Sequence, residues 1–158
     1  MKFSTICVAA LAALTQASPV KNTIKDVKLT VESDNKEING KGLSSLHEGA
    51  GLNYFFLGEG SQDLKYDSSS QKLYFDISDE ITYSFSVYSD FAIIGVLEPY
   101  KVEFNDNYLK VNGTTEGFFA CKNVNDPYQY SKDSYALMNF LGQEAPEGCI
   151  SLKVKNSA

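Results

Sequence analysis

The chain has 158 residues, of which 20 are acidic and 14 are basic, so its formal net charge is −6. Every basic residue is a lysine, and a chain without arginine lacks the planar guanidinium forks that bind phosphates and guanine in two-point contacts. The acidic balance therefore predicts that neither nucleic acid nor an anionic membrane surface is a partner.

The N-terminus has the pattern of a secretory signal peptide. Lys2 supplies a positive start, residues 6–14 (ICVAALAAL) form an apolar run, and Ala17 precedes a cleavage point before Ser18. The run is too short to span a bilayer. A buried strand or helix is the alternative for this run. We predict a signal peptide at 1–17 and a single all-β domain at 18–158, similar in extent to one ordinary domain.

Period-two alternation dominates the rest of the chain and indicates half-buried strands. In the run 26–33, for example, Val27, Leu29 and Val31 share one face and polar residues share the other. In the run 72–77 the same alternation places Ile77 on the inward face. In the run 83–89 Phe85 alternates with serines. About twelve strands are expected, in chain order at 26–33, 42–46, 53–58, 63–66, 72–77, 83–89, 91–97, 100–104, 108–113, 117–122, 135–140 and 150–154.

The run at 135–140 is the least determined of these, because its ALMNFL core could instead form one helical turn closed by Gly142. Turn sequences rich in Gly, Asn, Asp and Ser separate the runs. Short strands at nearly even spacing predict an antiparallel sandwich or a closed barrel. Twelve strands also fit three four-strand units, so we expect a β-trefoil-like fold, with a β-sandwich as the alternative.

Two cysteines, Cys121 and Cys149, remain once Cys7 leaves with the signal peptide. In an oxidising compartment such a pair most simply forms one disulfide. The alternative is a catalytic thiol. A cysteine nucleophile usually needs a histidine base, and the one histidine, His47, lies far away in the sequence.

Asn112 begins the sequon Asn-Gly-Thr, and the parity of its strand turns it toward solvent. We expect an N-linked glycan on Asn112; an unmodified type I′ turn is the alternative. The same parity argument turns Tyr74, Tyr88 and Tyr108 outward.

A proline-containing loop carries two further tyrosines, Tyr128 and Tyr130. Exposed aromatic faces stack on flat partners, and Asp126 and Gln129 supply oxygens that could bind hydroxyl groups. We expect Tyr128, Tyr130 and Asp126 to contact sugar. The alternative is that these tyrosines only cover neighbouring strands as cross-strand pairs.

Catalytic sites find little support in the sequence. His47 has Ser44, Ser45 and Glu48 as sequence neighbours, but such neighbours rarely converge into a triad. A glycosidase needs two carboxylates across a cleft, for which the pairs Asp79–Glu80 and Asp126–Asp133 can be named. Adjacent acids on a strand point to opposite faces, which argues against the first pair. We predict no catalytic residue, no cofactor and no metal site.

Three stretches resemble the C-terminal domain of PIR-type yeast cell-wall mannoproteins. They are 42–77, 100–122 (YKVEFNDNYLKVNGTTEGFFACK) and 135–154 (YALMNFLGQEAPEGCISLKV), and the start MKFST also looks like the secretion signal of these proteins. Within them, Phe119, Ala120 and Cys121 match the aromatic-to-cysteine element of the family.

This resemblance implies a compact, disulfide-closed domain that is secreted to a fungal cell wall and has a non-catalytic structural or surface-shielding role. A carbohydrate-binding module is the alternative. The glutamine-rich PIR repeat used for ester linkage is missing from the sequence. The polar C-terminal residues also lack the hydrophobic tail of a GPI signal. We therefore expect no membrane anchor and only non-covalent contact with wall polysaccharide.

Overall fold

The computed structural model describes residues 23–158, so the predicted signal peptide and Cys7 lie outside the described residues. Twelve strands and one short 3-10 helix, η1, make up the regular structure. The strands are β1 (Ile24–Glu32), β2 (Gly42–His47), β3 (Leu52–Gly58), β4 (Asp63–Asp67), β5 (Lys72–Asp76), β6 (Thr82–Tyr88), β7 (Phe91–Gly95), β8 (Val102–Asn105), β9 (Tyr108–Val111), β10 (Phe118–Cys121), β11 (Ala136–Asn139) and β12 (Ile150–Asn156), with η1 (Tyr130–Lys132) between β10 and β11.

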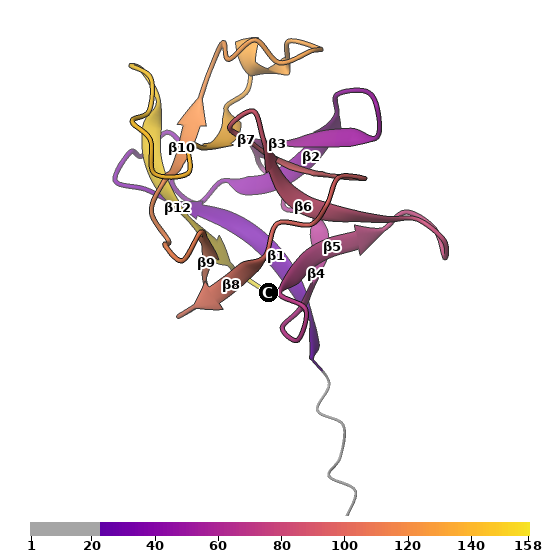
Figure 1. Cartoon of the computed structure of the whole chain (residues 1–158). Coiled ribbons are helices and arrows are strands. Elements are labelled where there is room, and N and C mark those ends of the chain that lie inside the picture. Colours follow the sequence, from indigo (N-terminus) through magenta and orange to yellow (C-terminus); the bar gives the residue numbers. More distant parts are fainter. Residues whose placement is uncertain (1–22) are drawn as a thin grey trace, which may run out of the picture.

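The strands pair antiparallel and close on themselves. The pairings run β1–β4–β5–β6–β7–β3–β11–β10–β12 and return to β1, which makes a closed barrel of nine strands. The last step joins the two ends of the domain, with Leu29 opposite Asn156 and Glu32 opposite Lys153. β2, β8 and β9 extend the sheet beyond this ring (Figure 1).

Three of the antiparallel pairs of consecutive strands recur at intervals of four strands: β2–β3, β6–β7 and β10–β11. Their strands β3, β7 and β11 also pair with one another. The predicted all-β class, with twelve strands and one disulfide, is therefore confirmed. The sheet closes as a barrel, and the trefoil assignment stays a prediction.

The alternation in β1 correctly predicts its buried face, since Val27, Leu29 and Val31 all lie in the core. The largest fully buried side chains in this core are the rings of Phe55, Phe85 and Phe118. A second, smaller cluster of buried residues contains Tyr54, Phe56, Phe91, Ile93, Cys121, Ala136, Met138 and Phe140.

Two details of the predicted faces are wrong. Ile77 is 51% exposed because β5 ends at Asp76 and Ile77 begins the turn into β6. Ser84 is buried, although it alternates with the core residue Phe85. Its partner in β7 is Gly95, where an added Cβ would lie 2.5 Å from the carbonyl oxygen of Gly51. The chain therefore covers both faces of β6 at this point.

The alternative of a helical turn at 135–140 is wrong, because β11 pairs with β3, β7 and β10. Leu141 and Gly142, both at positive φ, end the strand. The 3-10 helix η1 was not expected from the sequence. Across residues 23–158, no helix has both the length and the apolar character that crossing a membrane requires.

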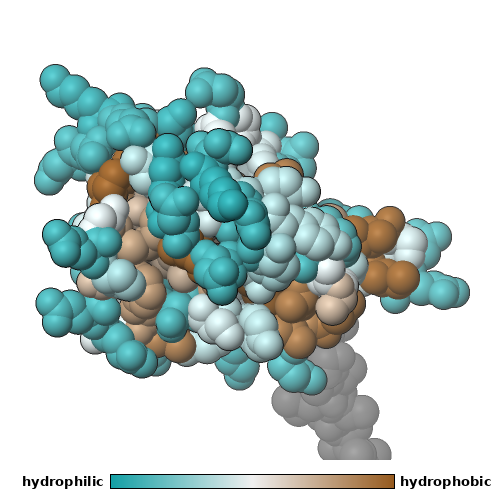
Figure 2. All heavy atoms as spheres, turned by 90° about the horizontal axis from the view of Figure 1, so that it is seen from above, coloured by the Kyte–Doolittle hydropathy of each residue, from teal (hydrophilic) through white to brown (hydrophobic). Residues whose placement is uncertain are grey.

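Figure 1 places the loop that follows β10 at the end of the molecule opposite the C-terminus. Figure 2 views the molecule from this upper side, where hydrophilic residues dominate and hydrophobic residues form separate patches.

Candidate functional site

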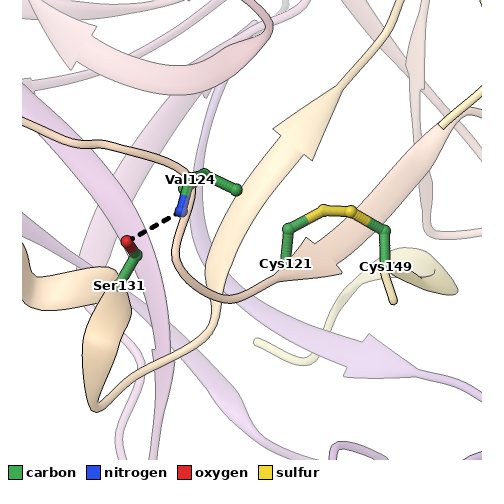
Figure 3. Close-up of a disulfide and its surroundings, with 4 residues drawn as sticks. All are labelled: Cys121, Val124, Ser131 and Cys149. Atoms are coloured by element: carbon green, nitrogen blue, oxygen red, sulfur yellow. Dashed lines mark hydrogen bonds between the residues drawn. A yellow bond between two sulfur atoms is a disulfide. The ribbon is translucent and has the colours of Figure 1, made fainter. Parts of the chain in front are cut away.

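The disulfide between Cys121 and Cys149 joins the end of β10 to the residue before β12, with Cα atoms 4.5 Å apart (Figure 3). Cys121 is buried in the smaller core cluster, and Phe119 packs against the same cluster. The predicted disulfide is thus confirmed, and the cysteines are not free thiols. Beside the bridge, the backbone N–H of Val124 donates to Ser131 Oγ at 3.1 Å, which ties the two ends of the next loop together (Figure 3).

The loop 122–132 holds the predicted sugar-contacting residues. Asp126 to Gln129 form a turn with Pro127 at its second position, closed by a hydrogen bond from Gln129 N to Asp126 O at 3.1 Å. Gln129 adopts a positive φ of 61° and leads into η1. A second backbone bond, from Asn123 N to Ser131 O at 2.9 Å, fixes the base of the loop.

An aromatic patch, which we define as His47, Tyr128 and Tyr130, lies on the surface of this loop and the end of β2. Tyr128 is 54% exposed and Tyr130 is 39% exposed. Their ring centroids are 6.2 Å apart, and the rings of His47 and Tyr128 are 6.1 Å apart, both in edge-to-face arrangements. Tyr130 also packs edge-on against Phe56, at 5.8 Å. The structure thus brings together the two predicted tyrosines and adds His47 to them.

Asp126, the third predicted sugar contact, lies beneath the loop surface. It is only 2% exposed, and it accepts hydrogen bonds from Ser131 N at 3.2 and 3.3 Å and from Ser131 Oγ. The expectation that Asp126 contacts sugar directly is therefore corrected, because hydrogen bonds from Ser131 occupy its oxygens within the loop. Sequence parity does not apply in loops, so this burial could not be predicted.

Glu48, which the sequence offered only as a neighbour of His47, bonds to the backbone of the loop. It follows β2 and is 5% exposed, and its Oε2 accepts the backbone N–H of Tyr128 at 2.8 Å. Its side chain also contacts the Asp126 carboxyl group. Burial raises the pKa of Glu48 above its ordinary value, and the neighbouring Asp126 adds to the increase.

The residues of a possible serine–histidine site do not converge. Ser44 Oγ donates to Gly60 O at 3.1 Å, and Ser45 Oγ donates to Gln62 Oε1 at 2.7 Å. His47 Nδ1 lies 3.3 Å from Asn53 Oδ1. Both hydroxyl groups therefore serve the packing of neighbouring loops. In the described part of the chain, no group of three or more His, Cys, Asp and Glu residues is placed to hold a metal ion.

Asn112 lies at the tip of the turn after β9. Asn112 and Gly113 have φ values of 53° and 79°, and Val111 and Thr114 exchange backbone hydrogen bonds at 3.0 and 3.2 Å. Positive φ at both central residues is the signature of a type I′ turn. Asn112 is exposed, so the turn and an accessible sequon coexist.

The outward tyrosines differ in their surroundings. Tyr108 donates to both carboxylate oxygens of Glu32 at 2.8 Å and lies below the ammonium groups of Lys153 and Lys155, so it fits the cross-strand alternative. The ammonium nitrogen of Lys72 lies over the ring of Tyr74, 5.5 Å from its centroid. Tyr88 is exposed at the end of β6.

An open hollow of about 640 Å³ lies next to the disulfide and is lined in part by residues 122–125 of the loop. Phe91, Met138 and Phe140 line it with apolar surface, and Asp90 and Lys122 are among its polar residues. With Glu147 as a third charged residue beside the apolar surface, the hollow is a mixed surface with no single ligand chemistry.

Comparison with known proteins assigns the family. A family model described as a domain of unknown function, DUF7907, matches residues 25–156. The chain belongs to the DUF7907 family. Three relatives, all from Candida albicans, are the cell wall proteins RHD3, PGA30 and PGA31. They are 36%, 38% and 36% identical to this chain over 82%, 98% and 98% of its length. No solved structure matches the chain.

The matched region of DUF7907 covers every strand except the first residue of β1. The chain spans 65%, 54% and 52% of the lengths of the three relatives, so each relative is considerably longer than this domain. The predicted location in the cell wall is confirmed by these relatives. The family that matches is DUF7907, and the resemblance to PIR-type domains stays a proposal.

Proposed function

We propose that this DUF7907 domain is a non-catalytic structural or surface-shielding element of the cell wall, built in the manner of PIR-type C-terminal domains. The observation that carries the proposal is the disulfide, which engages both cysteines of the described residues and cross-links the paired strands β10 and β12. The hydroxyls of Ser44 and Ser45 serve packing as well, which supports the same role.

An N-linked glycan at Asn112 belongs to this proposal. The side chain projects from an exposed turn, so an attached oligosaccharide would extend into solvent without disturbing a strand. A glycan at this tip adds bulk and hydration to the surface of the barrel, as a shielding role requires.

Fractionation of the native protein tests this role. A tagged chain expressed in a yeast host is followed through culture medium, detergent extract and glucanase digest of the wall. We expect it in the first two fractions, because the expected contact with the wall is non-covalent. Recovery only after glucanase digestion would contradict the proposal and indicate a covalent linkage.

A second candidate function is non-covalent binding of wall polysaccharide through the aromatic patch. The observation that favours it is the exposure of two tyrosine rings on one rigid loop, with the exposed side chain of Gln129 between them in the sequence. Aromatic rings fixed before binding lose little conformational entropy when a flat ligand stacks on them.

A glycan array tests this candidate directly. Tyr128→Ala and Tyr130→Ala should each weaken binding to the recognised polysaccharide, while Tyr74→Ala on distant β5 should leave it unchanged. An array on which the wild-type domain binds no glycan, or equal binding by all three variants, would exclude the patch as a binding site.

A further inference from the structure

Two carboxyl groups from distant parts of the sequence meet in the interior beneath the aromatic patch. Glu48 lies in the turn between β2 and β3, and Asp126 lies in the loop after β10. Both side chains are more than nine-tenths buried, and each carboxyl group shifts the pKa of the other. Two buried carboxylates in contact would repel each other, so their protonation needs an explanation.

The hydrogen bonds around the pair leave one buried carboxyl oxygen without a donor among the described residues. Glu48 Oε2 accepts the N–H of Tyr128, and Asp126 accepts the N–H and the hydroxyl of Ser131. Glu48 Oε1 is fully buried and meets no N–H or O–H donor among residues 23–158. An ionised carboxylate can only accept hydrogen bonds, whereas a protonated one donates. A proton on Oε1 would satisfy this atom by donating to the Asp126 carboxylate.

We propose that Glu48 and Asp126 share one proton, and that this carboxyl–carboxylate pair is a pH-sensitive latch that fixes the loop 126–131 to the β2–β3 turn. With the proton present, Glu48 holds the loop twice: it donates to Asp126 and accepts from the backbone of Tyr128. When the proton leaves, two buried negative charges face each other and the loop loosens. The latch therefore controls how rigidly Tyr128 and Tyr130 are presented.

The charges around the pair agree with this arrangement. Besides Asp126, the titratable group that acts on Glu48 is His47 on β2. The charge of His47 lowers the pKa of Glu48, but burial raises this pKa by more. Tyr54 on β3 faces both acids. Burial would also raise the pKa of Asp126, but the hydrogen bonds from Ser131 and Glu48 outweigh it and hold the pKa below its ordinary value. The two pKa values are therefore driven apart, as in a pair that holds a single proton.

The sign of the pH effect follows from these directions. A raised folded-state pKa at Glu48 means that its contribution is complete below its unfolded value of 4.5 and is lost as pH rises through the folded value. The lowered pKa of Asp126 means that its contribution is lost only as pH falls below the unfolded value of 3.8. The latch is thus closed below the raised pKa of Glu48 and opens as the pH rises through it.

Amide hydrogen exchange tests the latch without any ligand. The Tyr128 amide bonds directly to Glu48, so its protection factor reports whether the latch is closed. As the pH rises through the raised folded-state pKa of Glu48, we expect this protection to fall at least about tenfold in the wild type, since the pair then loses its proton. Glu48→Gln keeps a donor toward Asp126 and an acceptor for Tyr128, and should hold the protection constant.

Asp126→Asn provides a second variant, because its amide can donate to an ionised Glu48 while its oxygen accepts from Ser131. It should also abolish the pH dependence, whereas Glu98→Gln, the same change at an exposed glutamate, should leave it as in the wild type. Equal pH dependence in the wild type, Glu48→Gln and Asp126→Asn would overturn the proposal. So would unfolding of both latch variants. The effect of the latch on polysaccharide binding rests on the second candidate function, but the exchange result does not.

Discussion

Removing the disulfide with the double variant Cys121→Ala/Cys149→Ala should destabilise the domain without changing its fold. Alanine is the appropriate replacement at Cys121, because this side chain lies in the smaller core cluster and a serine would bury an unpaired hydroxyl. The strands that the disulfide joins are also paired by backbone hydrogen bonds, since Phe118 to Ala120 lie opposite Ile150 to Leu152. The barrel should therefore still form.

The size of the effect follows from the sequence separation of 28 residues between the two cysteines. In the chain-entropy model, closing a loop of this length lowers the free energy of folding by about 3.6 kcal/mol. Truncating the buried Cys121 side chain leaves a small cavity that adds up to about 1 kcal/mol. The free energy of unfolding should thus fall by about 3.5–4.5 kcal/mol, a large part of the stability of an ordinary domain.

Urea unfolding of the purified variant, followed by tyrosine fluorescence and circular dichroism, measures this difference. The reduced wild-type protein is the matched control, because it loses the same cross-link and keeps both side chains. If the free energy of unfolding fell by less than about 1 kcal/mol in both the variant and the reduced protein, the reasoning would be refuted. The unfolded chain would then be as restricted without the disulfide as with it. Thiol labelling of the denatured, unreduced wild type should detect no free cysteine.

Three further predictions concern single residues. Asn112→Gln expressed in yeast should remove one N-linked glycan, seen as a mass loss equal to endoglycosidase treatment, whereas Asn105→Gln outside any sequon should keep the wild-type mass. Gly95→Ala should destabilise the domain by about 1–3 kcal/mol, because the new Cβ would meet the Gly51 carbonyl; thermal unfolding should show no comparable loss for Gly58→Ala, which meets no atom within 4 Å. Leu29→Ala in the core should cost about 2–5 kcal/mol in urea unfolding, and a similar cost for the exposed Ile77→Ala would contradict the assigned burial.

The positions of the strands could be predicted from the chain alone, because alternation of apolar and polar side chains is a local property. Each of the twelve expected runs overlaps one observed strand, and the run at 26–33 corresponds to β1 at Ile24–Glu32. The disulfide could also be predicted, since removal of the predicted signal peptide with Cys7 would leave one pair of cysteines. For Asn112, parity and the Asn-Gly turn preference together predicted an exposed turn.

The surroundings of the candidate site depend on contacts that form only in the folded barrel. Alternation assigns a side chain to one face of a strand, but it does not say whether that face is covered, as the buried Ser84 shows. Parity has no meaning in the loop 122–132, so the burial of Asp126 had no signal in the sequence. Glu48 meets Tyr128 only because β3 and β11 pair and bring the loop after β10 over the β2–β3 turn. A contact between residues this far apart depends on which strands lie side by side, and that choice is made by packing of the whole barrel.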